Sequence, residues 1–170
     1  MIREARAEDL PEMRDIEVAA GEAFQTLGMG AVADDAPPSL EALANYQRDG
    51  RAWVATDSGD VAVAYILVDV VERFAHIEQV TVHPLHARQG LGRQLIDEAA
   101  RWAVTLGLDG MTLTTFEEVP WNAPYYARLG FQPVPEHEWP GGLRRIVQSE
   151  RAHGLEAWPR IVMKRRLPGG

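Results

Sequence analysis

Residues 80–108 read VTVHPLHARQGLGRQLIDEAARWAVTLGL, and in this stretch an apolar run is joined to a helical pattern through a proline and two glycines. The run before Pro84 is strand-like, and it ends there because proline has no backbone donor for strand pairing. Behind Gly90 and Gly92, apolar residues recur at three- and four-residue steps, as on one face of an amphipathic helix. These residues are Leu91, Leu95, Ala99, Trp102, Ala103 and Leu106. The stretch therefore predicts a strand, a glycine-containing turn and a helix that lies on a sheet.

Glycines at the head of a helix are compatible with an anion-binding site. A helix N-terminus carries unpaired backbone donors and a partial positive charge, and glycine lets those donors approach a phosphate closely. Arg88 and Arg93 flank the two glycines and can supply charge, or can be solvated surface arginines. The phosphate-loop signature is absent because no lysine follows, and the dinucleotide fingerprint needs glycine where Leu95 stands. The segment alone leaves a plain tight turn and an anion site as alternatives, and it disfavours an NAD- or ATP-dependent enzyme.

Length and composition predict one domain over residues 1–170, with room for a single core. Cysteine is absent, which excludes disulfides, thiolate metal sites and a cysteine nucleophile. The formal charge of −8 argues against nucleic-acid binding, which needs a concentrated basic surface. The charged N-terminal residues and the lack of a long apolar run predict neither a signal peptide nor a membrane helix, so we expect a cytoplasmic protein without a membrane partner.

Strand and helix patterns alternate along the chain. We predict strands at residues 2–6, two within 51–71 joined by a turn at 57–60, and others at 74–84, 111–116, 131–134 and 158–167. Helices are predicted at residues 7–24, 40–47 behind a Ser39 cap, 91–106, 121–130 and 143–152. In the first hairpin, Val61, Val63, Tyr65 and Leu67 are predicted to share a face. The order predicts an α/β fold, with a mixed sheet and helices on both of its faces.

Two motifs in this order resemble the GNAT N-acetyltransferase family. The first, similar to that family's acetyl-coenzyme A signature, is Val80-Thr81-Val82-His83-Pro84 followed by Arg88-Gln89-Gly90-Leu91-Gly92-Arg93. The second, similar to its asparagine, tyrosine and Gly-Phe motif, comprises Asn122, Tyr126, Gly130 and Phe131. The resemblance covers residues 2–133 in element order and the last strand more loosely, while 134–157 does not align. Ala87 departs from the family pattern, which often has glutamine or arginine there.

The resemblance implies both a fold and a cosubstrate. The fold is the GNAT-like acyl-CoA N-acyltransferase fold, a mostly antiparallel twisted sheet of about six to seven strands with a splay between strands 4 and 5. The cosubstrate is acetyl-CoA, and no metal is implied. The resemblance places acetyl-CoA against Val80, Thr81, Val82, Arg88, Gln89, Gly90, Leu91, Gly92, Arg93 and Asn122. Asn122 also fits a helix cap.

Acetyl transfer to an amine needs a base, a donor for the oxyanion and a proton for the departing thiolate. Glu78 shares a strand face with Val82, because side chains repeat every two positions. It coincides with a glutamate that serves as base in some relatives, although a glutamate at the edge of the core is an equal alternative. The resemblance implies the Val80 backbone donor for the oxyanion and Tyr126 as the acid. Tyr125 points about a hundred degrees away on a helix and is predicted to pack or to contact the acceptor.

The acceptor is less well specified by the sequence. In relatives it lies against the first two helices and the loops near the last strands, which here carry Glu17, Glu22, Phe24, Asp34, Asp35, Glu117 and Glu118. Several acids near an amine pocket favour a cationic acceptor, although most such charges lie on solvated surfaces. The five histidines lack a ligand spacing, so no metal site is predicted.

The leading hypothesis is an N-acetyltransferase that transfers acetyl directly from acetyl-CoA to a primary amine of a small, cationic molecule in a ternary complex. The absence of cysteine favours direct transfer, because no thiol can hold the acetyl group. A non-catalytic acyl-CoA-binding sensor and a protein or peptide N-acetyltransferase are the alternatives. Dimers are common in the resembling family, so a homodimer is also an expectation.

Overall fold

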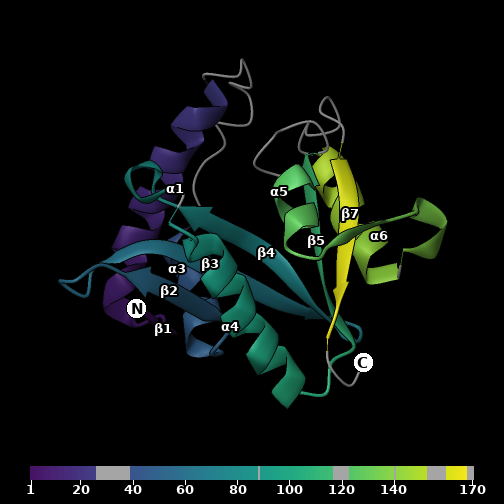
Figure 1. The fold of residues 1–170 in the computed structure, drawn as a ribbon, viewed down its shortest axis with the longest axis horizontal. Helices are drawn as coiled ribbons and strands as arrows, with labels where there is room; N and C mark the ends of the chain where they lie inside the picture. Colours follow the sequence, from purple (N-terminus) through teal and green to yellow (C-terminus); the bar gives the residue numbers. More distant parts are fainter. Residues whose placement is uncertain (26–38, 88, 117–122, 140, 153–159, 168–170) are drawn as a thin grey trace. The chain divides into compact units, whose positions relative to one another are not determined.

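The computed structural model describes residues 1–25, 39–87, 89–116, 123–139, 141–152 and 160–167. Its elements follow the predicted order (Figure 1), and its seven strands hydrogen bond in the order β1-β2-β3-β4-β5-β7-β6. The strands are β1 Ile2–Glu4, β2 Ala52–Thr56, β3 Ala62–Val71, β4 Phe74–Val82, β5 Gly110–Phe116, β6 Gln132–Val134 and β7 Arg160–Arg166. The α-helices are α1 Leu10–Gln25, α3 Leu40–Arg48, α4 Leu91–Thr105, α5 Ala123–Arg128 and α6 Gly141–Ala152. The predicted mixed, mostly antiparallel sheet with flanking helices is confirmed.

The chain divides into two compact units. The first comprises residues 1–68 and 78–99, and the second comprises residues 69–77 and 100–170. The prediction of one domain over residues 1–170, made from length and composition, therefore stays a prediction.

The first unit is built on the hairpin of β2 and β3. Residues 62–68 of β3 are all buried, so both faces of this strand are covered. Tyr65 and Leu67 join a cluster with Met13 of α1 and Leu43 of α3, whose N-cap Ser39 accepts from the Ala42 amide at 3.0 Å, as predicted. Figure 1 shows α4 crossing the other face of these strands. Of the predicted face residues Val61 is an exception, because it precedes the strand and is exposed.

Helix α4 confirms most of its predicted apolar face. Leu95, Ala99 and Ala103 are buried, and so are Ile96 and Ala100, which the prediction omitted. Leu106 was predicted to belong to this face and this is wrong, since its side chain is 52% exposed. The helix ends at Thr105, and the chain turns at Gly107 with φ +71°, so Leu106 lies beyond the last helical turn.

The second unit is a sheet of β5, β7 and β6 with the first residues of β4. Strand β5 pairs with β7 over seven residue pairs, and β6 pairs with the other edge of β7. The parallel ladder between β4 and β5 is short, from Phe74↔Gly110 to His76↔Thr112, although both strands continue beyond it. Helix α6, which begins two residues before its predicted start, buries Leu143 against Val162.

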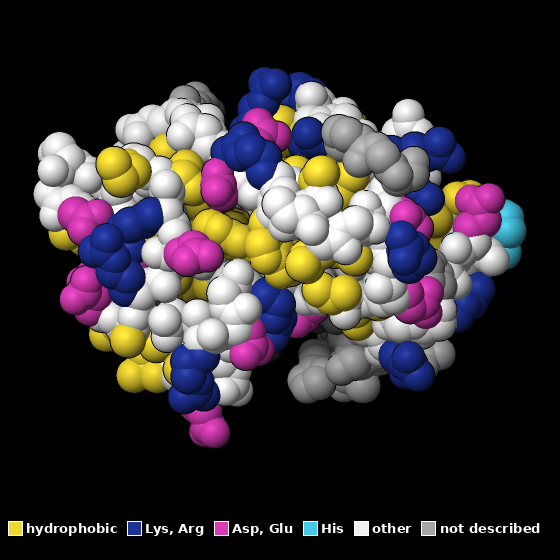
Figure 2. Space-filling model, turned by 90° about the horizontal axis from the view of Figure 1, so that it is seen from below, with side chains coloured by type: hydrophobic (Ala, Val, Ile, Leu, Met, Phe, Trp, Pro, Cys, Tyr) yellow, Lys and Arg dark blue, Asp and Glu magenta, His cyan; other side chains and the backbone are white. Residues whose placement is uncertain are grey.

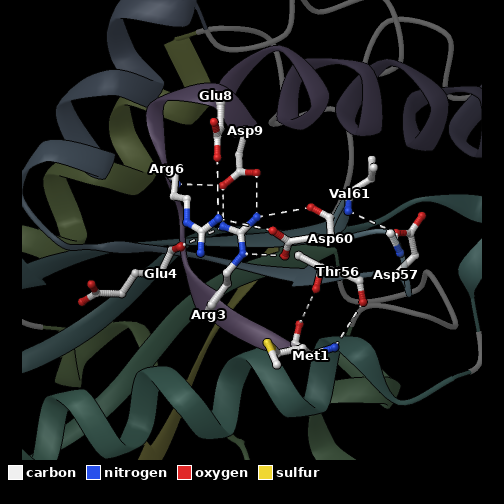
Figure 3. A network of polar contacts seen from close by, with 11 residues as sticks. Met1, Arg3, Glu4, Arg6, Glu8, Asp9, Thr56, Asp57, Asp60 and Val61 are labelled. Atoms are coloured by element: carbon white, nitrogen blue, oxygen red, sulfur yellow. Dashed lines mark hydrogen bonds and ion pairs between the residues drawn. The ribbon is translucent and has the colours of Figure 1, made fainter.

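A salt-bridge network at the start of the chain ties β1 to the hairpin turn (Figure 3). The Arg3 guanidinium donates to both carboxylate oxygens of Asp9 at 2.7 and 3.0 Å, and to Asp60 Oδ1 at 3.0 Å. Asp9 is 4% exposed and also accepts from the Arg6 amide at 2.7 Å. Burial raises the pKa of Asp9, but the hydrogen bonds from Arg3 and Arg6 outweigh it, so the pKa lies below its ordinary value. The charged form of Asp9 therefore stabilises the fold.

We expect Asp9→Asn to lower the free energy of unfolding by about 3 kcal/mol, because it leaves Arg3 without its buried partner. The folded-state pKa of Asp9 lies below its unfolded value, so its contribution is complete above the unfolded pKa of ~3.9 and is lost as the pH falls through the folded pKa. Urea unfolding at pH 7 and at pH 3 measures both effects. Asp60→Asn is the control, since the Asp60 carboxylate is 53% exposed and should matter by less than about 1 kcal/mol. Equal losses in the two variants would contradict this account.

The surface carries both signs of charge. Figure 2 shows Lys and Arg side chains interspersed with Asp and Glu side chains on the face drawn, rather than gathered in one basic surface. Among the described helices, none has the length and hydropathy to cross a membrane.

Candidate active site

The turn between β4 and α4 presents backbone donors at a helix N-terminus. After β4 ends at Val82, His83 caps a short 3-10 turn by accepting from the Leu85 amide at 3.1 Å. Gly90 follows with φ +75°, in the left-handed region that favours glycine. The Gln94 amide donates to the Gly90 carbonyl at 3.1 Å, which is the first helical bond of α4.

Four amides at the start of α4 therefore have no partner within the helix. They belong to Gly90, Leu91, Gly92 and Arg93, because an α-helix leaves its first four N–H groups unpaired. Gly92 lies inside the helix rather than in the turn, so Gly90 alone of the two glycines has a positive φ. Such a group of donors at the head of a 15-residue helix fits a phosphate or pyrophosphate group.

The side chains around this turn differ in placement. Gln89 is exposed, and the Arg93 side chain is 70% exposed and lies 4.0 Å from the Asp97 carboxylate, one turn along the helix. Arg93 is therefore placed at the surface, beside the amides of the first turn. Arg88 lies outside the described residues, so the predicted flanking pair is described only for Arg93.

Strand β4 presents different residues on its two faces. Glu78 is exposed, and Val80 and Val82 are half-buried, at the alternating positions that share one face. Gln79 and Thr81 lie on the other face, where both hydrogen bond to Glu17 of α1. The Thr81 hydroxyl is thus engaged with α1, and the predicted contact of Thr81 with the cofactor stays a prediction.

Tyr126 is buried at the end of α5 in the second unit, 8% exposed. Its ring packs edge-to-face on Tyr125 and on Phe131, with centroids 5.2 and 5.9 Å apart. The amides of Leu129 and Phe131 donate to its carbonyl and close the turn at Gly130. Burial, and then the neighbouring Tyr125, raise the pKa of Tyr126 well above its ordinary value, so its hydroxyl stays protonated. Glu78 and Tyr126 belong to different compact units, each described by itself.

Several predicted residues fall outside what the structure describes. Asn122, Asp34, Asp35, Glu117 and Glu118 lie in undescribed segments, and the side chains of Glu22 and Phe24 are likewise not described. The acceptor side is therefore represented by Glu17. Sequence reasoning missed its partners Tyr65 and Gln79, because alternation along β3 and β4 gives their faces but does not say that both meet α1.

Among the described residues, no group of three or more histidine, aspartate or glutamate side chains is placed so that it could hold a metal ion. His76 is 1% exposed, and its Nδ1 lies 3.0 Å from the Thr112 hydroxyl of β5. Trp139 donates its indole N–H to the Val134 carbonyl at 2.9 Å and packs beside Leu143, so it belongs to the core of the second unit.

Known proteins share both the sequence pattern and the fold. The chain is 28% identical over 72 residues to an uncharacterized N-acetyltransferase of Bacillus subtilis, YobR, which covers 42% of this chain. The chain spans about 29% of the length of that relative. An acetyltransferase of the GNAT family from Staphylococcus aureus has the same fold, with a TM-score of 0.74, 14% identity and 98% of each chain covered. PaiA N-acetyltransferase from Thermoplasma acidophilum, solved with coenzyme A, gives 0.67 at 14% identity, again with 98% of each chain covered.

The pattern of one family runs through both units. It matches residues 10–131, from the first helix to the phenylalanine behind α5, and so includes β4, the Gly90 turn and Tyr126. With this match over most of its length, the chain belongs to the acetyltransferase (GNAT) family.

Proposed function

We propose that the chain is an acetyl-CoA-dependent N-acetyltransferase that acetylates a primary amine of a small cationic molecule by direct transfer. The turn from β4 into α4 carries the proposal, because Gly90 enters the helix with a positive φ and the first four amides of α4 have no partner within the helix. Those donors suit the pyrophosphate of coenzyme A, and family membership selects this cosubstrate. The acidic balance of 25 Asp and Glu to 17 Lys and Arg supports a cationic acceptor.

The cosubstrate supplies an activated acetyl thioester, and the residues of the chain are assigned as follows. The Val80 amide donates to the carbonyl oxygen as the amine nitrogen bonds to the carbonyl carbon and negative charge develops on that oxygen. Glu78 takes the proton that the amine must lose. Tyr126 gives a proton to the sulfur as the carbon–sulfur bond breaks, so that the products are an N-acetyl amine and free coenzyme A. The backbone of Val82 pairs with the pantetheine arm.

Calorimetric titration with acetyl-CoA, with NAD and ATP as controls in the same buffer, tests the proposal directly. We expect heat of binding for acetyl-CoA alone, followed by amine-dependent release of thiol in a panel of alkyl amines. Binding with no acetyl loss against any amine would instead indicate a non-catalytic acyl-CoA sensor. Acetylation of peptides in preference to small amines would point to a protein N-acetyltransferase. No binding of acetyl-CoA would refute the proposal.

Gly90→Ala should weaken acetyl-CoA binding about tenfold. Among the described residues, an alanine Cβ at this position would meet only Gln94 Nε2, at 4.0 Å, so these neighbours tolerate the substitution. It forces an L-residue into the left-handed region, which costs about 1–2 kcal/mol and favours a different turn in which the amides no longer converge.

Gly50→Ala is the matched control for this change. Gly50 has φ +69° with nothing within 4 Å of an added Cβ, and it lies in the turn between α3 and β2. Both variants should lose similar thermal stability, whereas only Gly90→Ala should lose acetyl-CoA affinity in the titration. A similar loss of affinity in Gly50→Ala would assign the effect to general destabilisation.

A further inference from the structure

One carboxylate oxygen in the first unit collects three hydrogen bonds. Glu17 Oε2 of α1 accepts from the Tyr65 hydroxyl at 2.9 Å, from Gln79 Nε2 at 2.7 Å and from the Thr81 hydroxyl at 3.0 Å. Gln79 Nε2 also donates to the Thr81 hydroxyl oxygen at 2.9 Å, so the Thr81 hydroxyl hydrogen remains free to point at Glu17. Three donors of this network are thus directed at one oxygen of one acid.

The network is partly buried rather than spread on the surface. Tyr65 is 0% exposed and Thr81 is 8% exposed, while Gln79 and Glu17 are half-buried. Burial, and then the charge of Glu17, raise the pKa of Tyr65 well above its ordinary value, so the phenol stays a donor. Three donors of fixed direction hold the carboxylate of Glu17 in one orientation.

The charge of Glu17 is stabilised but not neutralised. All three partners are uncharged, and none of the ion pairs among the described residues includes Glu17. Withdrawing a carboxylate from water without a cation is unfavourable, so a neutral residue would serve better if this position only joined a helix to a sheet. The arrangement keeps a negative charge on Glu17 with which a cationic ligand can form an ion pair.

The second carboxylate oxygen of Glu17, Oε1, can still accept hydrogen bonds. A carboxylate offers about four lone-pair sites on two oxygens, and the three donors occupy Oε2. Within the described residues no hydrogen bond is made to Glu17 Oε1. An ammonium group carries three donors and a full positive charge, and it therefore suits Oε1 in both charge and hydrogen bonding.

The position of Glu17 points to the acceptor. Its partners Gln79 and Thr81 are the two neighbours of Val80, whose amide is assigned to the thioester oxygen. We propose that Glu17 binds an ammonium group of a cationic acceptor beside this segment of β4 and so selects cationic over neutral acceptors. This inference rests on the proposed N-acetyltransferase function. It assigns amine binding to Glu17 and leaves proton removal to Glu78.

Calorimetric titration with 1,4-diaminobutane and with butylamine, in the presence of coenzyme A and without turnover, tests the assignment. Glu17→Gln keeps the size of the side chain and an oxygen for the three donors, and it removes only the charge. We expect it to weaken amine binding by about 10- to 100-fold, as for loss of a hydrogen bond to a charged group. Glu12→Gln, an exposed position on the same helix, should change binding by less than about twofold.

Tyr65→Phe separates charge from packing. It removes one of the three donors and keeps the carboxylate, so amine binding should weaken less than about fivefold. Unchanged amine binding in Glu17→Gln, an equal loss in Tyr65→Phe, or no binding of either amine by the wild-type protein would overturn the assignment.

Acetyl-CoA titration of the same proteins keeps this inference distinct from the proposed function. We expect Glu17→Gln to bind acetyl-CoA like the wild type, which also shows that the variant is folded. If the wild-type protein bound the amines through Glu17 but did not bind acetyl-CoA, the proposed N-acetyltransferase function would be refuted and the assignment of amine binding to Glu17 would stand. If Glu17→Gln lost both ligands, its carboxylate would be a structural tie and the assignment would fail.

Discussion

Tyr126→Phe is expected to lower kcat about 10²-fold and to leave acetyl-CoA affinity within about threefold of the wild type. The hydroxyl is assigned to protonate the departing thiolate, and proton transfer from a positioned side chain contributes about 10²- to 10⁴-fold. The ring packing against Tyr125 and Phe131 does not involve the hydroxyl, so phenylalanine should keep the fold. Steady-state turnover and calorimetric titration of one preparation separate the two effects.

The pH profile provides a second readout for Tyr126. Because burial raises its pKa above the ordinary ~10, the phenol stays protonated through the range in which an exposed tyrosine would begin to ionise. Wild-type kcat should therefore not fall between about pH 8 and pH 10 through loss of this proton. Tyr125→Phe is the control, since Tyr125 is half-buried and stacks under Arg128 at 6.0 Å, and it should retain kcat within about threefold. Full turnover by Tyr126→Phe at every pH would refute the assignment of the acid.

Local signals in the sequence were sufficient for most of the fold. The period of apolar residues gave α4, the break at Pro84 gave the end of β4, and Ser39 gave the start of α3, because each depends on a few neighbouring residues. Leu106 shows the limit of a periodic pattern, because the apolar spacing continues one residue beyond Thr105, where the helix ends. The short ladder between β4 and β5 depends on residues more than thirty positions apart, and here only the family resemblance suggested a splay.

The candidate site was predictable to a lesser degree. The Gly90 turn could be read from spacing, because a helix start and a residue that tolerates positive φ are both local properties. The Glu17 network joins residues separated by 48 to 64 positions, and nothing in the neighbourhood of Glu17 distinguishes it from Glu12. The three donors to Glu17 can be identified only from the folded structure, in which α1 lies against strands β3 and β4.

Glu78→Gln is expected to lower kcat/KM about 10²-fold at pH 7, as for loss of a general base. An alkylamine titrates near pH ~10.4, so at neutral pH nearly every acceptor molecule carries a proton that must be removed. As the pH approaches that value the amine becomes neutral without help, and the deficit of Glu78→Gln should shrink steadily. A glutamate that only supports the fold would give a deficit independent of pH. The ratio of wild-type to variant kcat/KM between pH 7 and pH 10 therefore distinguishes the two roles.

Glu4→Gln is a suitable control, because Glu4 is an exposed glutamate on a strand of the same unit and should leave the ratio near one at every pH. The comparison with Glu17→Gln assigns the two acids separately. If Glu17 binds a cationic group of the acceptor and Glu78 removes the proton of the reacting amine, the first variant raises KM and the second lowers kcat. A pH-dependent deficit in Glu17→Gln, with none in Glu78→Gln, would exchange the two roles. No deficit in either would require a water molecule to take the proton.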